Sequence, residues 1–286
     1  MRIYAVAVAT NNEGYYDALI ESCKRNEIEL IVLGYGEKWQ GFAWRFLLIK
    51  QFLETLVDND VVICIDAYDL ISTQHISVIK ERFIEFNSPI VLSTEDVDDY
   101  SIQYYARKKI FGHCNKANVC GGAYMGYVYA LKKLYSRICA GFDCSNPSFS
   151  TLDDQRILTH ICKDDEFVKQ YIQFDYHSSI FYTIKYPSNI IDMVNNVFQP
   201  DPEIHEIIDN RLYFKDTQTS PCFIHGNGNV NMDFLINLYN LEKPKVERKK
   251  YFLKTIQNYF KFLMVEVAII IILILCICFL IYKKTK

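Results

Sequence analysis

Apolar runs alternate with amphipathic stretches over the first third of the chain. The runs at 3–9, 29–33, 61–65 and 89–92 are short and nearly continuous, which predicts buried strands. The stretches at 14–24, 42–56 and 76–86 carry apolar residues at helical spacing and predict helices between these strands. Regular alternation of strand and helix is the pattern of a right-handed parallel α/β sheet. The expected fold class is therefore α/β with a mostly parallel sheet.

The pattern is less regular in the rest of the chain. It predicts a strand at 123–128 after Gly121 and Gly122, a helix at 153–162, a short strand at 221–225 and a helix at 229–239. The stretches at 96–119 and 141–151 are interpreted as loops that lie over a site.

Two acidic residues, Asp66 and Asp69, follow closely after the central apolar run 61–65. An unbroken apolar run of this length indicates a strand buried on both faces. Ligands of open α/β sheets bind beyond the carboxyl ends of such strands. Because hard divalent cations take oxygen ligands, Asp66 and Asp69 are candidate metal ligands. The alternative is an ordinary acidic turn that caps a helix.

Two further motifs carry candidate chemistry. His225 follows a short apolar run, and Asn227 and Gly228 follow it in a glycine-flanked turn. His225 could then be a third metal ligand beside a loop that holds phosphate. The alternative is that the segment is a plain Asn-Gly turn. Asp153 and Asp154 lead into a predicted helix, where they act either as caps or as an acceptor-side base or orienting carboxylate.

Aromatic and basic side chains near these motifs leave two interpretations open. Trp39 and Tyr68 could sandwich a nucleobase, or they could be core aromatics, which is the commoner fate of such residues. Arg45, at the head of a predicted helix, could reach a phosphate or could simply be solvated.

The C-terminal stretch 263–282 is apolar and has one charge, Glu266. At 1.5 Å per residue it would span about 30 Å, which is the hydrocarbon thickness of a bilayer. It predicts a transmembrane helix, so the expected organisation is a head at 1–242, a basic linker at 243–262, the span at 263–282 and a basic tail at 283–286. Without an N-terminal signal peptide, a tail-anchored single-pass protein with a cytosolic head is expected, and a head in the ER or Golgi lumen is the alternative.

Charge and cysteine placement bear on partners and compartment. From Lys243 onward ten basic residues oppose two acidic ones, although the whole chain has a formal net charge of −3. The head is therefore acidic and is not expected to bind nucleic acid. Most of the ten cysteines are interpreted as buried free thiols of a reducing compartment. Pairing among Cys114, Cys120, Cys139 and Cys144 stays open.

Seven short motifs, taken in order, resemble one family. They are Val8-Ala9-Thr10 with Glu13-Gly14, Leu33 to Trp39, Ile65 to Asp69, Val91 to Glu95, Gly121-Gly122 with Gly126-Tyr127, Asp154-Gln155, and Ile224 to Gly228. In this order they resemble the glycosyltransferase domain of the procollagen lysyl hydroxylases and, more distantly, procollagen galactosyltransferases. The resemblance covers about residues 3–240.

The resemblance implies a GT-A-like, Rossmann-type fold, a UDP-sugar donor and Mn²⁺. Asp66, Asp69 and His225 would then bind the metal. The nucleotide would be bound by a second group of residues, with Tyr68 stacking on uracil, Thr10 and Trp39 lining the pocket, and Asn227 and Gly228 approaching the diphosphate. Arg45 falls where the family has a lysine near the donor. Asp154, with Asp153 beside it, falls in the family's acidic acceptor-side run.

The expected function is that of a membrane-anchored, metal-dependent glycosyltransferase that moves galactose or glucose from a UDP-sugar. The acceptor would be a hydroxyl of a protein or glycan, with hydroxylysine of a collagen-like protein as one candidate. The loop between Trp39 and Arg45 is shorter than in the family, and no hydroxylase domains are present in this sequence, so acceptor specificity is not inherited. An inactive membrane-tethered binding or scaffold protein is the alternative, and a metal-dependent hydrolase of the donor is a third reading.

Overall fold

A computed structural model describes residues 1–95, 114, 118–185, 198–227 and 230–243, together with 264, 268, 271–278 and 282–283 of the C-terminal segment. The chain divides into two compact units. One comprises Met1–Tyr186 with Val197–Lys245, and the other Pro187–Asn196 with Val246–Lys286. The architecture given below is that of the first unit.

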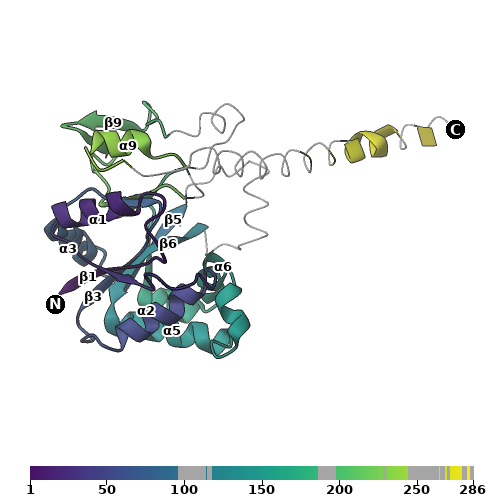
Figure 1. Cartoon of the computed structure of the whole chain (residues 1–286). Helices are drawn as coiled ribbons and strands as arrows, with labels where there is room; N and C mark the ends of the chain where they lie inside the picture. The colour runs from purple at the N-terminus through teal and green to yellow at the C-terminus, as the bar shows by residue number, and fades with distance from the viewer. Residues whose placement is uncertain are drawn as a thin grey trace. The chain divides into compact units, whose positions relative to one another are not determined.

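A six-stranded sheet forms the centre of this unit (Figure 1). Its strands, in spatial order, are β2 (Glu29–Leu33), β1 (Ile3–Val8), β3 (Val61–Asp66), β6 (Asn118–Tyr127), β5 (Ile90–Glu95) and β7 (Ile172–Asp175). β1 pairs in parallel with β2 and β3, and β5 pairs in parallel with β7. β6 runs antiparallel to both of its neighbours. The α/β class with a mostly parallel sheet therefore agrees with the sequence, and the arrangement fits the GT-A type.

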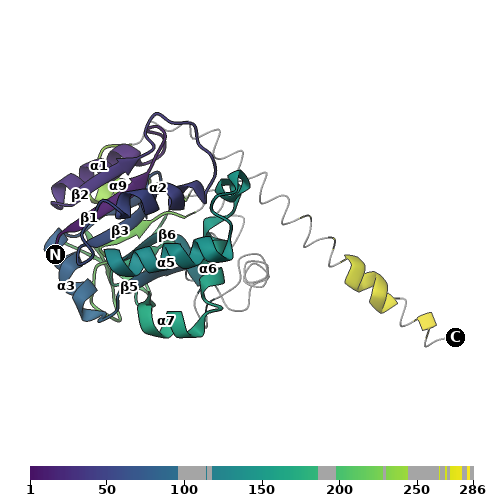
Figure 2. The ribbon, with the colours of Figure 1, turned by 90° about the horizontal axis from the view of Figure 1, so that it is seen from below.

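Helices cover both faces of the sheet because side chains of the buried strands alternate between two cores. Val6 and Val8 of β1 pack into one cluster, and Ala5 and Ala7 pack into the other. On one side lie α1 (Tyr16–Arg25) and α3 (Ile76–Glu85). On the other side lie α2 (Trp44–Leu53), α5 (Val128–Gly141), α6 (Asp154–Ile161) and α7 (Asp165–Tyr171), as Figure 2 shows.

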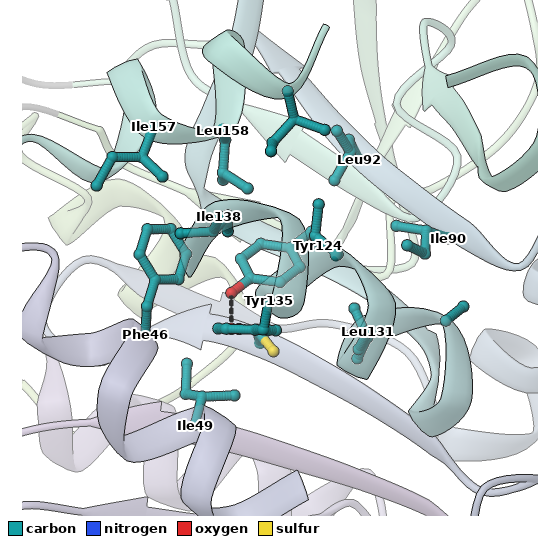
Figure 3. Close-up of a cluster of buried hydrophobic side chains, with 14 of the residues drawn as sticks. Phe46, Ile49, Ile90, Leu92, Tyr124, Leu131, Tyr135, Ile138, Ile157 and Leu158 are labelled. Atoms are coloured by element: carbon teal, nitrogen blue, oxygen red, sulfur yellow. Dashed lines mark hydrogen bonds between the residues drawn. The ribbon is translucent and has the colours of Figure 1, made fainter. Parts of the chain in front are cut away.

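The core beneath α2 and α5 is anchored by aromatic side chains (Figure 3). The rings of Phe46 on α2 and Tyr135 on α5 pack edge to face, with centroids 5.5 Å apart. The hydroxyls of Tyr135 and Tyr124 hydrogen-bond to each other, which satisfies two polar groups that are buried away from water. Phe46 directly follows Arg45, so this packing fixes the start of α2 and the point from which Arg45 projects.

A second, three-stranded sheet joins three segments that are far apart in the sequence. β4 (Leu70–Ser72) pairs antiparallel with β11 (Phe223–His225), which pairs in parallel with β8 (Phe181–Thr183). In the part of this unit that the structure describes, the remaining elements are the hairpin of β9 (His205–Ile208) and β10 (Arg211–Phe214), the 3₁₀ turn η1 (Pro147–Thr151) and α9 (Asp233–Leu238).

Two disulfides correct the interpretation of the cysteines. Cys114 pairs with Cys162, and Cys139 pairs with Cys144. The second pairing had stayed open, whereas the participation of Cys162 was not expected. Since disulfides persist in oxidising surroundings, they count against the predicted reducing compartment. Cys23, Cys64 and Cys222 are buried free thiols, as expected, and Cys120, whose pairing had stayed open, is a buried free thiol as well.

The transmembrane helix predicted at 263–282 is wrong, and the single-pass membrane localisation and the membrane partner predicted with it are wrong too. Within the described residues, every helix falls short of the length and apolar character that crossing a bilayer requires.

Candidate functional site

Asp66, Asp69 and His225 meet at the carboxyl end of β3. Asp66 ends β3, and Asp69 directly precedes β4. The pairing of β4 with β11 then brings His225 opposite Leu70, and the Gly226 amide donates to the Asp69 carbonyl at 2.7 Å. One ligand atom from each of the three side chains lies within 4.8 Å of the other two. The structure thus brings together the three residues that sequence analysis proposed as metal ligands.

The imidazole of His225 is almost completely buried, with 2% of the residue exposed. Its Nε2 lies 3.4 Å from Asp66 Oδ2 and 3.3 Å from Asp69 Oδ1, yet it makes no hydrogen bond in the described part of the chain. Burial alone would lower the pKa of His225, but the Asp69 carboxylate and the contact with Cys120 raise that pKa well above its ordinary value. A buried ring nitrogen aimed between two carboxylates is the arrangement that a cation would complete.

Gly122 on β6 keeps the space beside these candidate ligands open. A Cβ at this position would lie 2.3 Å from His225 Cε1 and 2.6 Å from Asp66 Oδ2. Because β6 is antiparallel to β3, its early residues lie beside the carboxyl end of β3, so Gly122 reaches the site. The donor set and this side-chain-free wall both fit a divalent metal. Carboxylates suit Mg²⁺ and Mn²⁺, and imidazole is a ligand of several transition metals.

Arg45 links Asp66, in the candidate metal site, to Asp154 at the start of α6. Its guanidinium forms ion pairs with Asp66 and Asp154 and donates to the Gly121 carbonyl at 3.1 Å. Only 13% of the Arg45 side chain is exposed, so the solvated alternative is wrong. Burial would lower the pKa of Arg45, but Asp154 more than offsets this and the pKa is raised. A planar guanidinium can contact both carboxylates and still present hydrogens to a phosphate.

The two acidic residues at the start of α6 have different roles in the structure. Asp153 is the N-cap, since its carboxylate accepts from the Arg156 amide at 2.8 Å. Asp154 is buried and is paired with Arg45. The capping interpretation of Asp153 is therefore confirmed. Asp154 instead contacts Arg45, which also pairs with Asp66 of the candidate metal site. Acceptor-side roles for both residues stay predictions.

The predicted nucleotide-binding residues form separate groups. The hydroxyl of Tyr68 accepts from the Thr10 amide at 2.8 Å, which joins the acidic turn to the end of β1. Asn227 donates to Glu95 at the end of β5. Trp39 is 37% exposed and packs edge to face against Trp44 and Phe42, so no contact between Trp39 and Tyr68 is found among the described residues. Gly228 lies outside the described residues.

Three site residues had no role assigned from the sequence. Gly122 stood in a glycine pair whose close approach to a site could have been suspected, because glycine in a strand often marks such an approach. Glu95 ends an apolar strand, as Asp66 does, and the same rule applies to it. Cys120, which contacts His225, carried no sequence signal.

Comparison with protein families identifies the chain. The family model described as the PLOD GT domain matches residues 1–251. The chain belongs to this family. The predicted resemblance to the glycosyltransferase domain of the procollagen lysyl hydroxylases is confirmed, and the PLOD GT domain covers every candidate site residue named above.

Curated relatives of this PLOD GT domain include a nematode protein and a fly protein. The chain is 26% identical over 240 residues to a multifunctional procollagen lysine hydroxylase and glycosyltransferase of Caenorhabditis elegans. The aligned region covers 79% of this chain and 30% of that protein. The chain is also 25% identical over 259 residues to a procollagen-lysine,2-oxoglutarate 5-dioxygenase of Drosophila melanogaster. That alignment covers 83% of this chain and 32% of the fly protein. The chain thus spans about a third of the length of these relatives.

Proposed function

We propose that this PLOD GT domain transfers a hexose, galactose or glucose, from a UDP-sugar to a hydroxyl acceptor with the help of a divalent metal. The observation that carries the proposal is the convergence of Asp66, Asp69 and His225 at the carboxyl end of β3, in a chain of this family. Mn²⁺ is the metal that we propose, on the strength of the family resemblance. Two carboxylates and one imidazole are compatible with it.

The protein's own residues would divide the work between donor and acceptor. The metal would neutralise negative charge on the departing diphosphate. Arg45, held beside Asp66, would add a second positive group there, and preorganised charge of this kind stabilises a leaving group in a site shielded from water. Tyr68 and Thr10, joined by their hydrogen bond, would form one wall of the nucleotide pocket. Asn227, held by Glu95, would approach the phosphates from the β11 side.

The acceptor that we propose is a hydroxyl group of a protein, with hydroxylysine of a collagen-like chain as the first candidate. The support is the nematode relative, which is named as a multifunctional procollagen lysine hydroxylase and glycosyltransferase. Asp154 is the residue that we propose on the acceptor side, since Asp153 already caps α6.

Replacing Asp69 with asparagine should remove Mn²⁺-dependent UDP binding. We expect the affinity to fall by more than about 100-fold, because even outer partners of metal ligands are worth roughly 10–100-fold. Isothermal titration of UDP with and without Mn²⁺ measures this, and release of UDP from UDP-galactose and UDP-glucose measures turnover.

Asp58→Asn is the matched control, since Asp58 is an exposed aspartate whose described ion pair is with Lys132. It should bind UDP and Mn²⁺ as the unaltered chain does. Equal Mn²⁺-dependent UDP binding in Asp69→Asn and Asp58→Asn would contradict the proposed ligand set. Tight metal-dependent UDP binding without any sugar transfer would instead support the inactive binding protein considered from the sequence.

A further inference from the structure

The two ring nitrogens of His225 face different neighbours. Nε2 faces the carboxylates of Asp66 and Asp69, whereas Nδ1 lies 3.4 Å from the sulfur of Cys120. Among the residues that the structure describes, Cys120 is the partner found for Nδ1. A neutral imidazole carries its proton on one nitrogen only, so His225 can ligate a metal through Nε2 only if the proton is on Nδ1.

Cys120 lies in an irregular part of β6, beside Nδ1 of His225. Val119 pairs with Thr94 and Tyr124 pairs with Leu92, so residues 120–123 of β6 stand opposite Ser93 alone. Bulges of this kind redirect side chains, and they are common beside active sites. Cys120 is 1% exposed, so the surrounding core determines where its sulfur lies.

We propose that Cys120 is a positioning residue for His225, whose Nδ1–H donates to the Cys120 sulfur so that the Nε2 lone pair faces the metal position between Asp66 and Asp69. This inference rests on the proposed function. Histidine ligands of metals usually donate their second N–H to a carboxylate or a carbonyl. A thiol sulfur is a weaker acceptor, but it is neutral and adds no further negative charge beside two carboxylates.

The opposite polarity of this contact would prevent ligation. If the Cys120 thiol donated to Nδ1, the ring proton would lie on Nε2 and would point at the carboxylates. The position of this single proton therefore separates a ligand from a hydrogen-bond donor, and Cys120 is the neighbour that determines it.

Mn²⁺ binding to the full chain, followed by the electron paramagnetic resonance signal of the free ion, tests the proposal. We expect Cys120→Ala to weaken Mn²⁺ binding about 10–100-fold, and Cys120→Ser, whose hydroxyl still accepts, to stay within about threefold of the unaltered chain. In activity assays, Cys120→Ala should raise the Mn²⁺ concentration needed for half activation and leave kcat at saturating Mn²⁺ nearly unchanged.

Cys23→Ala separates positioning from packing. Cys23 is a free thiol on α1, and it is 1% exposed, as Cys120 is. Both alanine variants remove one buried sulfur, but only Cys120→Ala should alter Mn²⁺ affinity. Equal Mn²⁺ affinity in Cys120→Ala and the unaltered chain would overturn the inference and leave the proposed metal site intact. Failure of the unaltered chain to bind Mn²⁺ would overturn both proposals.

A measurement on the unaltered chain avoids any question of whether a variant folds. With Mg²⁺, which is diamagnetic, ¹⁵N nuclear magnetic resonance can report which nitrogen of His225 carries the proton. We expect a protonated Nδ1 and an unprotonated Nε2. A protonated Nε2 in the Mg²⁺-loaded protein would overturn the inference.

Discussion

Replacing Gly122 with alanine is expected to abolish metal-dependent donor binding. The added Cβ would lie 2.3 Å from His225 Cε1 and 2.6 Å from Asp66 Oδ2. Contacts this short force His225 and Asp66 to shift, and the buried His225 has little room to do so, so two of the three proposed ligands leave their positions. Extra atoms in a close-packed interior cost about 1–3 kcal/mol, and here the cost falls on the site itself. Titration with Mn²⁺ and UDP measures the loss.

Gly141→Ala provides the matched control. A Cβ at Gly141 would find its nearest neighbour, His160 Cδ2, at 3.9 Å, which is ordinary contact. This residue ends α5, and alanine there should be neutral or stabilising by up to about 1 kcal/mol. Circular dichroism of both variants establishes that they fold. A folded Gly122→Ala protein that binds Mn²⁺ and UDP as Gly141→Ala does would contradict the proposed role of the open wall.

Replacing Arg45 with methionine should cause the largest loss of stability among changes in the site. Arg45 contacts Asp66 and Asp154 with little exposure to water, so its removal leaves two carboxylates facing each other without a cation. Breaking a buried pair costs about 3–5 kcal/mol, since the remaining charge stays buried. Urea unfolding of the metal-free chain measures the free energy of unfolding, and sugar transfer should be lost as well.

Two other variants sharpen this test. Arg45→Lys keeps the charge but loses the planar fork that spans two carboxylates, so its stability should lie between those of the unaltered chain and Arg45→Met. Arg25→Met removes an exposed pair with Glu21 and should cost at most about 1 kcal/mol. If Arg45→Met were no less stable than Arg25→Met, the ion pairs of Arg45 with Asp66 and Asp154 would not contribute to stability as expected.

The first half of the fold follows from hydrophobic periodicity, while the second half does not. The run 61–65 became β3, and the predicted strand at 29–33 coincides with β2. α5 was missed although Leu131, Leu134, Tyr135 and Ile138 show helical spacing. The preceding strand β6 runs directly into α5, so no turn signal separates the two patterns. The antiparallel direction of β6 depends on tertiary pairing, which periodicity does not report.

The candidate site, like the fold, was predicted only where the local sequence carries a signal. The turn after β3 could be recognised because acidic residues end an apolar strand. His225 was a candidate third ligand from its own motif, but only the family resemblance joined it to Asp66 and Asp69, since the pairing of β4 with β11 cannot be recognised in the local sequence. The packing of the Trp39 ring against Phe42 and Trp44 could not be predicted either, because an aromatic side chain in a loop has no periodicity that shows where it points. Its place in the nucleotide pocket stays a prediction.

The pairing of β4 with β11 also has a consequence for the order in which the protein matures. During synthesis the carboxylates of Asp66 and Asp69 leave the ribosome long before His225. Contacts between such distant segments form slowly, because the entropy of closing the intervening loop is lost before the contact stabilises the chain. A nascent or truncated head that ends before β11 therefore has the acidic turn but not the third proposed ligand. Metal capture would then be restricted to molecules that have completed this last pairing.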